Sequence, residues 1–209
     1  MKKIIALFII ILAIAVVTTY SVFAGNIIDE LRGKIVLQVE DNGEAWYINP
    51  STDTRFFLDR PDSAFRLMKT LGLGITNEHL DKIPIGLFAQ SGEDTDKDGL
   101  VDLLETAIKT NLNNPDSDAD NFLDKEELLN GYNPNGDGRF PILPLDQDLI
   151  NLVKGKILLQ VENHGEAWYV YPSNGKRYFL GRPSDAFEIM RGMGLGISNS
   201  DLAKINIAD

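Results

Sequence analysis

Short runs of alternating hydrophobic and polar residues begin the globular part of the chain. Residues 35–40, 45–49 and 55–58 are rich in β-branched and aromatic side chains. The segments between them, 41–43 and 50–53, carry the Asp, Asn, Gly, Pro and Ser residues that favour tight turns. The pattern predicts three short strands that pair as a β-meander.

A helical pattern follows the third predicted strand. Apolar residues recur at helical spacing between a Pro–Asp pair that favours a helix start and a glycine that favours a helix end: Pro61, Asp62, Ala64, Phe65, Met68, Leu71 and Gly72. Thr76 is a candidate N-cap for a last helical turn that carries Leu80 and Ile83. These elements predict a small α+β unit of about 55 residues, near the lower size limit for independent folding.

The same pattern occurs a second time. Residues 33–83, the first repeat, align without a gap with residues 155–205, the second repeat, and about 30 of the 51 aligned positions are identical. The Thr76 position is Ser198 in the second repeat, with the capping-box spacing to Asp201. We therefore predict an α+β fold in which two copies of one module, a three-stranded β-meander plus a helix, occupy residues 31–86 and 153–209 and flank a different segment.

The N-terminus has the pattern of a targeting segment. Lys2 and Lys3 precede an apolar run over 4–19, and Val-Phe-Ala before Gly25 resembles a signal-peptidase site. Residues 1–24 are thus predicted to be a signal peptide, and the protein to be secreted or on the cell surface. The alternative is an uncleaved membrane anchor with the rest outside the cytoplasm, because the apolar run approaches the ~20 residues that span a bilayer.

Composition points to cations as partners. The formal net charge is -11, and no cluster of Lys and Arg is present to neutralise phosphates, so we expect no nucleic-acid partner. The chain has no Cys, which excludes a disulfide framework in an exported protein. Most of the net negative charge lies between the repeats, in residues 92–138, called here the acidic segment. Bound metal is the remaining way to crosslink such a chain.

The acidic segment contains two twelve-residue loops, 94–105 and 116–127, each with carboxylates at positions 1, 3, 5, 9 and 12. The predicted ligands of the first loop are Asp94, Asp96, Asp98, Asp102 and Glu105 with the backbone carbonyl of Leu100. The predicted ligands of the second loop are Asp116, Asp118, Asp120, Asp124 and Glu127 with the carbonyl of Phe122. Position 9 binds directly or through water, and position 12 supplies two oxygens.

The donor chemistry favours calcium at both loops. Hard oxygen ligands without His or Cys argue against zinc and copper, and a coordination of six to eight suits calcium better than magnesium. Gly99 at position 6 permits a positive φ, and Asn121 replaces it in the second loop as the next best residue, which makes that site the weaker. A solvated acidic surface is the alternative, but the repeated five-carboxylate spacing favours two Ca²⁺ ions.

These loops do not form an ordinary EF-hand pair. They start about 22 residues apart, and residues 85–92 lack the amphipathic pattern of an entering helix, so each loop is predicted to have only an exiting helix, over 103–110 and 125–130.

A known family shares the pattern of the acidic segment. Three stretches carry the resemblance: Asp-Thr-Asp-Lys-Asp-Gly-Leu-Val-Asp, Thr-Asn-Leu-Asn-Asn-Pro-Asp-Ser-Asp-Ala-Asp and Gly-Tyr-Asn-Pro. Over about 45 residues the segment resembles the bacterial thrombospondin type 3 repeat. Asn121, Leu103 and Leu104 depart from that pattern. The resemblance implies structural calcium binding in a secreted or surface protein, often between other domains.

The predicted function is structural. Without an entering helix there is no helix pair for calcium to open, so we expect two Ca²⁺ ions to rigidify the joint between duplicated modules. The alternative is a cell-wall or carbohydrate-binding protein whose partner is cell-wall polysaccharide or another surface protein. That protein would bind sugar on repeated aromatics for avidity: Trp46, Tyr47, Trp168, Tyr169, Tyr171 and Tyr178. Aromatics at alternate strand positions more often serve packing.

We expect no enzymatic activity. His79 and His164 occupy non-equivalent positions of the two repeats, and the chain has no Cys nucleophile and no phosphate-binding glycine loop. The carboxylates with regular spacing are those assigned to calcium.

Overall fold

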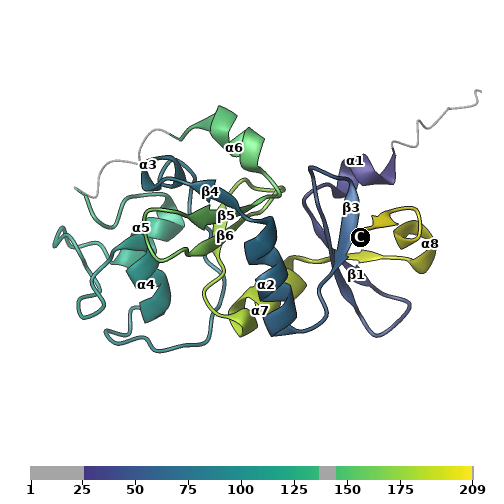
Figure 1. Cartoon of the computed structure of the whole chain (residues 1–209). Coiled ribbons are helices and arrows are strands. Elements are labelled where there is room, and N and C mark those ends of the chain that lie inside the picture. The colour runs from purple at the N-terminus through teal and green to yellow at the C-terminus, as the bar shows by residue number, and fades with distance from the viewer. Residues whose placement is uncertain (1–25, 137–144, 209) are drawn as a thin grey trace, which may run out of the picture.

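The computed structural model describes residues 26–136 and 145–208 (Figure 1). Within these ranges the protein is α+β, with a five-stranded sheet, a four-stranded sheet and eight helices. None of the described helices is long and apolar enough to span a membrane. The predicted targeting segment, residues 1–24, lies outside the described residues.

The five-stranded sheet is built on the predicted meander of the first repeat. Strands β1 (Ile35–Gln38), β2 (Ala45–Ile48) and β3 (Thr54–Phe57) pair antiparallel in sequence order. Two further strands, β8 (Leu195–Ile197) and β9 (Asn206–Ile207), lie parallel to β1 and β3 at the two edges. The predicted meander is confirmed, with strand ends that shift by one or two residues where the turns begin.

The four-stranded sheet repeats this arrangement. Strands β5 (Ile157–Gln160), β6 (Ala167–Val170) and β7 (Arg177–Phe179) form the second meander, and β4 (Leu73–Ile75) lies parallel to β5. Ile85 forms an isolated parallel bridge with Arg177. In the other sheet, Ile207 of β9 pairs in the same way with Arg55.

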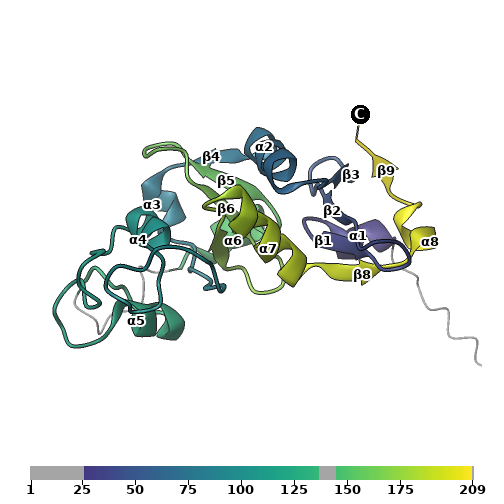
Figure 2. The ribbon, with the colours of Figure 1, turned by 90° about the horizontal axis from the view of Figure 1, so that it is seen from below.

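The two repeats exchange their last quarter. Strand β4 belongs to the first repeat and joins the second meander, whereas β8 belongs to the second repeat and joins the first meander (Figure 2). Both strands are formed by the Gly-Leu-Gly-Ile motif, for which the sequence predicted only a helix end. The ranges 31–86 and 153–209 therefore do not form two separate units in space.

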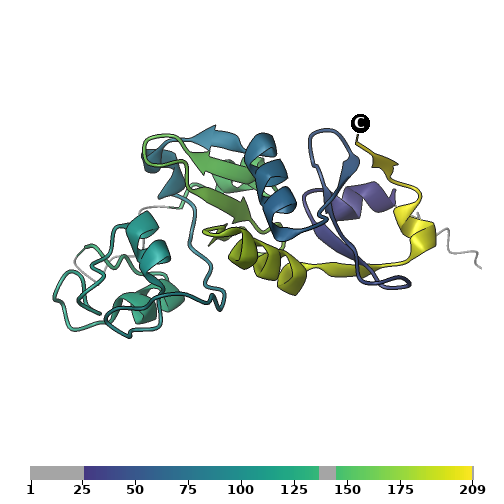
Figure 3. The same ribbon diagram turned by 60° about the horizontal axis from the view of Figure 1, so that its bottom comes forward.

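Helices α2 (Pro61–Leu71) and α7 (Pro183–Met193) pack against each other between the sheets (Figure 3). Each helix begins at its proline, as predicted, although the N-cap residue is the preceding arginine and makes no side-chain cap bond. Gly72 then ends α2 directly against the other meander, where an added Cβ would lie 2.5 Å from Cγ of Leu159. A single linking residue thus carries the chain from the helix into the exchanged strand.

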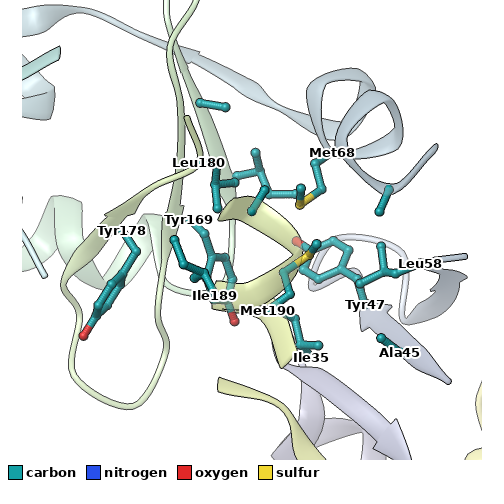
Figure 4. Packing of buried hydrophobic residues seen from close by; sticks show 14 residues of the cluster. Ile35, Ala45, Tyr47, Leu58, Met68, Tyr169, Tyr178, Leu180, Ile189 and Met190 are labelled. Atoms are coloured by element: carbon teal, nitrogen blue, oxygen red, sulfur yellow. The ribbon is translucent and has the colours of Figure 1, made fainter. Parts of the chain in front are cut away.

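The central core is shared by both repeats. Met68 of α2 and Met190 of α7 gather with Tyr47 and Leu58 from the first meander and Tyr169 from the second (Figure 4). Each of the two tyrosine hydroxyls donates a hydrogen bond to a backbone carbonyl of the other repeat. Tyr47 donates to the carbonyl of Gly155 at 2.8 Å, and Tyr169 donates to the carbonyl of Gly33 at 2.7 Å.

These two glycines allow the backbones to touch. A Cβ on Gly33 would lie 2.4 Å from Cα of Gly155, and both residues have positive φ, so no other residue type fits this approach.

Four short helices complete the repeats. Helices α3 (Asn77–Leu80) and α8 (Asn199–Leu202) begin after Thr76 and Ser198, whose side chains accept the predicted cap bonds. Helices α1 (Ile27–Leu31) and α6 (Gln147–Val153) precede the meanders and were not predicted. The acidic segment adds α4 (Asp102–Ile108) and α5 (Asp124–Asn130), which begin one residue earlier than predicted and, for α4, end two residues earlier.

Candidate metal centre

The two acidic loops have the same backbone shape. Positions 4 and 6 take positive φ in both: 67° at Lys97 and 92° at Gly99, against 63° at Ala119 and 77° at Asn121. Positive φ costs an L-residue roughly 1–2 kcal/mol, least for Asn and Asp. Asn121 therefore adopts the left-handed conformation predicted for it, and the second loop accepts a strained Ala119 as well.

Three aspartates of each loop converge on one point. The carboxylates of Asp94, Asp96 and Asp98 each offer an oxygen within 4.8 Å of the others, and Asp116, Asp118 and Asp120 do the same. Each group of three is called a triplet below. The structure therefore provides two groups of oxygen donors that fit metal ions at the predicted places.

Backbone N–H groups hold these carboxylates in position. In the first loop, Lys97 and Gly99 donate to the two oxygens of Asp94, at 2.8 and 3.1 Å. Leu100 donates to Oδ1 of Asp98 at 2.6 Å, which leaves Oδ2 of Asp98 buried without a partner. In the second loop, Asn121 and Phe122 donate to Asp116 and Asp120 in the same way. Oδ2 of Asp96 and of Asp118 are likewise buried and unpaired.

The glutamates at position 12 are buried. Glu105 is 0% exposed and Glu127 is 2% exposed. Oε2 of Glu105 and both carboxylate oxygens of Glu127 have no hydrogen-bond partner. Burial first, and then the aspartates of the same triplet, raise the pKa of each glutamate to about 7. Unpaired buried carboxylates are costly, which indicates that a cation belongs beside them.

The acids at position 9 have a different environment. Both oxygens of Asp102 accept hydrogen bonds from Thr95, from its backbone N–H at 2.8 Å and its hydroxyl at 2.8 Å. Both oxygens of Asp124 accept from Ser117 in the same way, at 2.8 and 2.6 Å. These aspartates tie the start of each loop to the start of its helix. Each of these oxygens keeps a further lone pair, as the oxygens of Asp94 do beside their own hydrogen bonds, so direct contact with a metal ion and contact through water both fit the geometry.

Sequence reasoning missed Thr95 and Ser117. The signal for them is a hydroxyl residue at loop position 2, seven residues before the Asp at position 9, in both loops. The carbonyls predicted at position 7 stay predictions. At that position Leu100 turns its side chain into the core, where it is 2% exposed, while the side chain of Phe122 is 50% exposed.

The loops also touch each other. Nζ of Lys125, next to the helix start of the second loop, donates to the carbonyl of Gly99 in the first loop at 3.0 Å. The charge of Asp124 contributes to the raised pKa of Asp98, after burial and the neighbouring aspartates. A change in charge at one site is therefore felt at the other.

The exiting helices fix the loops to the four-stranded sheet. Leu100, Leu104, Ala107 and Leu128 belong to one buried cluster with side chains of that sheet, Trp168 and Phe179 among them. Gln90 donates to the carbonyl of Phe179 at 2.9 Å from the connection that leads into the first loop. That connection, 86–92, contains no helix, as predicted.

The repeated aromatics mostly serve packing. Trp168 is 0% exposed, and Tyr47, Tyr169 and Tyr178 are buried. A platform of equivalent tryptophans in both repeats is therefore not available on the surface. His79 and His164 are exposed, at a helix and in a turn.

No protein-family model matches the chain, and neither a curated protein nor a solved structure shows significant similarity to it.

Proposed function

We propose that the protein is an exported structural protein that binds two calcium ions, through loops 94–105 and 116–127, and that these ions rigidify the acidic segment, which joins the two repeats in sequence and packs on the four-stranded sheet. The observation that carries the proposal is the convergence, in each loop, of an aspartate triplet with a buried glutamate whose oxygens lack partners. The likeness of the acidic segment to thrombospondin type 3 repeats supports the same role.

The donor atoms favour calcium among the common ions. Asp94, Asp96, Asp98 and Glu105 would hold the first ion, and Asp116, Asp118, Asp120 and Glu127 would hold the second. These ligands are carboxylate oxygens, which hard cations prefer, and a bidentate glutamate at position 12 suits the larger calcium ion better than octahedral magnesium. A bound divalent cation would neutralise charges that otherwise repel one another. Asp102 and Asp124 would keep the loops closed around it.

The ligands are coupled to the packing on the four-stranded sheet. In each loop a ligand lies next to a residue of the buried cluster, as Glu105 does to Leu104 and Glu127 to Leu128. Folding the loop around an ion therefore also places those leucines on the sheet. Without the ion, repulsion within each triplet favours an open loop and loosens the cover. This is how calcium would stabilise the cover over the four-stranded sheet.

Calorimetric titration of residues 25–209 with calcium tests the proposal. We expect two ions per chain, and a stoichiometry near zero would remove the central claim. Glu105→Gln and Glu127→Gln serve as site-specific variants, each expected to lower the stoichiometry to one. Glu126→Gln is the matched control, because Glu126 precedes a ligand and has no place in the triplets, so it should retain both sites.

A further inference from the structure

The outer faces of the two sheets are built from equivalent residues. On the four-stranded sheet this face carries Trp168, Arg177 and Phe179, with Ile85 beside them. On the five-stranded sheet the same register places Trp46, Arg55, Phe57 and Ile207 together. We call these two sets the covered face and the open face.

Local geometry agrees closely between the two faces. The Trp–Phe ring centroids are 5.1 Å apart on the covered face and 4.9 Å on the open face. The guanidinium lies over the indole at 4.7 and 4.8 Å. Each indole N–H donates to a glutamine, Gln160 or Gln38, at 3.3 and 3.2 Å. The open face is therefore formed and ordered in the same way as the covered one.

Burial separates the two faces. Phe179 is 6% exposed, whereas the equivalent Phe57 is 44% exposed. Ile85 is 7% exposed, whereas the equivalent Ile207 is 59% exposed. The acidic segment makes the difference, because its Leu104, Ala107 and Leu128 pack in the cluster of the covered face. Among the described residues, only α1 and α8 pack near the open face, around Val36 and Ile48.

The described residues, 26–136 and 145–208, cover only one of the two faces fully. They form two equivalent faces but contain one acidic segment, and that segment is already packed on the four-stranded sheet. If the acidic segment of one copy packed on the open face of a second copy, Trp168 of the first copy would become exposed. Such an exchange would bury no additional apolar surface. A free segment of the same kind, carried by another chain, would supply the missing cover.

Charge on the open face suits an acidic partner. On the covered face, Arg182 lies beside the acidic segment, since a Cβ on Gly92 would sit 3.3 Å from its Nη2. The equivalent residue, Arg60, has an 81% exposed side chain. A segment like 93–127, which has twelve carboxylates and three lysines, would bring a charge opposite to that of Arg60.

We infer that the open face is a docking site for an acidic loop–helix segment of another protein, which would pack leucines against Trp46, Phe57 and Ile207. The inference rests on the proposed function only for the calcium-loaded state of that segment. The acidic segment on the covered face shows what such a partner segment would look like. It would have two short exiting helices with an aliphatic face, held by metal-binding loops.

A labelled peptide of residues 86–136 is the probe for this site. Its fluorescence anisotropy is followed as full-length protein is added, in about 5 mM calcium, above the roughly 10⁻⁴–10⁻³ M range of extracellular sites. We expect saturable binding. Phe57→Asp and Ile207→Asp should each weaken it at least about tenfold, because an unpaired charge would be buried at the contact. Leu152→Asp is the matched control, an exposed leucine of α6 at 66% exposure, and should bind as wild type.

A fusion removes any dependence on whether the free peptide folds alone. Ile207 is equivalent to Ile85 and Asp209 to Leu87, so residues 88–136 appended after Asp209 would continue from the open face as they do from the covered one. Iodide quenching then reports Trp46, since Trp168 is fully buried. We expect calcium to lower the quenching of Trp46 to less than about half of its value in the unfused protein, as burial of a half-exposed indole requires.

The outcomes separate this inference from the proposed function. If the peptide bound the protein while neither of them bound calcium, the result would support this inference and contradict the proposed function. Two calcium ions per chain, with no peptide binding and unchanged Trp46 quenching in the fusion, would overturn the inference alone. Peptide binding that ignores Phe57→Asp and Ile207→Asp would also overturn it. Two further results would overturn it: self-association of the protein, or retention on cell-wall polysaccharide, if these two variants abolish it. Either result would show that a different partner binds the open face.

Discussion

The covered face and the open face carry the same residues in the same register, yet only one is buried. The difference arises from the acidic segment, which packs on the four-stranded sheet and has no counterpart on the five-stranded sheet among the described residues. Sequence identity therefore sets the local geometry of a face, while a separate segment decides whether that face belongs to the core. If calcium holds the segment closed, calcium also maintains the difference between the two faces.

The largest expected contrast comes from truncating the equivalent phenylalanines. Phe179→Ala removes a buried ring from the cluster and should lower the free energy of unfolding by about 3–5 kcal/mol. Phe57→Ala removes a ring that is 44% exposed and should cost about 1 kcal/mol. Denaturant unfolding in calcium measures both variants. Equal costs would show that the two faces are buried alike in solution.

Chelation should loosen only the covered side. Limited proteolysis in a chelator is expected to cut the acidic segment, at residues 90–135, much faster than in calcium, because carboxylate repulsion opens the loops. Residues 33–58, on the side of the open face, should be cut at the same rate in both conditions. Equal rates of cleavage within residues 90–135 with and without chelator would contradict the proposal that calcium folds this segment.

Acidification should strengthen the metal-free protein. Glu105 and Glu127 have folded pKa values of about 7, above the ordinary 4.5, so the folded state binds more protons than the unfolded state between these limits. Stability is therefore highest near pH 4.5 and is lost as the pH rises to 7. The carboxyls with lowered pKa, such as Asp53 and Asp201, lose stability only below their ordinary range near 4.

Denaturation in chelator at pH 5 and pH 7.5 measures this dependence. The double variant Glu105→Gln, Glu127→Gln should flatten it. Calcium should reverse the trend, because protons compete with the ion for the same oxygens. A metal-free protein that grows more stable from pH 5 to 7.5 would contradict the burial of these two acids.

The smallest effect concerns the two loops. Asn121→Gly should tighten the second site by about 0.5–1 kcal/mol, because glycine adopts its φ of 77° without strain. Gly99→Ala should weaken the first site, since φ there is 92° and the new Cβ would meet Lys125. Calcium titration of each variant measures the change. No gain from Asn121→Gly would mean that backbone strain does not limit the second site.

Local patterns predicted most of the elements. Period-two alternation and turn residues located both meanders, and the Thr76 and Ser198 caps located α3 and α8. The aspartate spacing located both triplets, because ligands that must converge on one point fix the sequence separation. Position 9 was less predictable, since Asp102 and Asp124 also accept hydrogen bonds from Thr95 and Ser117, which the aspartate spacing does not reveal.

Local sequence patterns could not predict the exchange of β4 and β8 between the sheets, and the reason is physical. The two meanders have nearly the same sequence, so β4 has near-equivalent partners in β1 and β5, which differ only at Val36 and Leu158. The choice is made by the single residue Gly72 between α2 and β4, which is too short a link to turn the chain back to its own meander. Glycine-rich strands of three residues also lack a hydrophobic period that would reveal them.

Iodide quenching of Trp168 in a Trp46→Phe variant tests the central claim most directly. Trp168 lies under the acidic segment and is fully buried, so the account predicts strong protection in calcium. In chelator it predicts quenching that approaches that of the half-exposed Trp46 on the open face. Equal protection of Trp168 in calcium and in chelator would contradict the claim that calcium holds this cover in place.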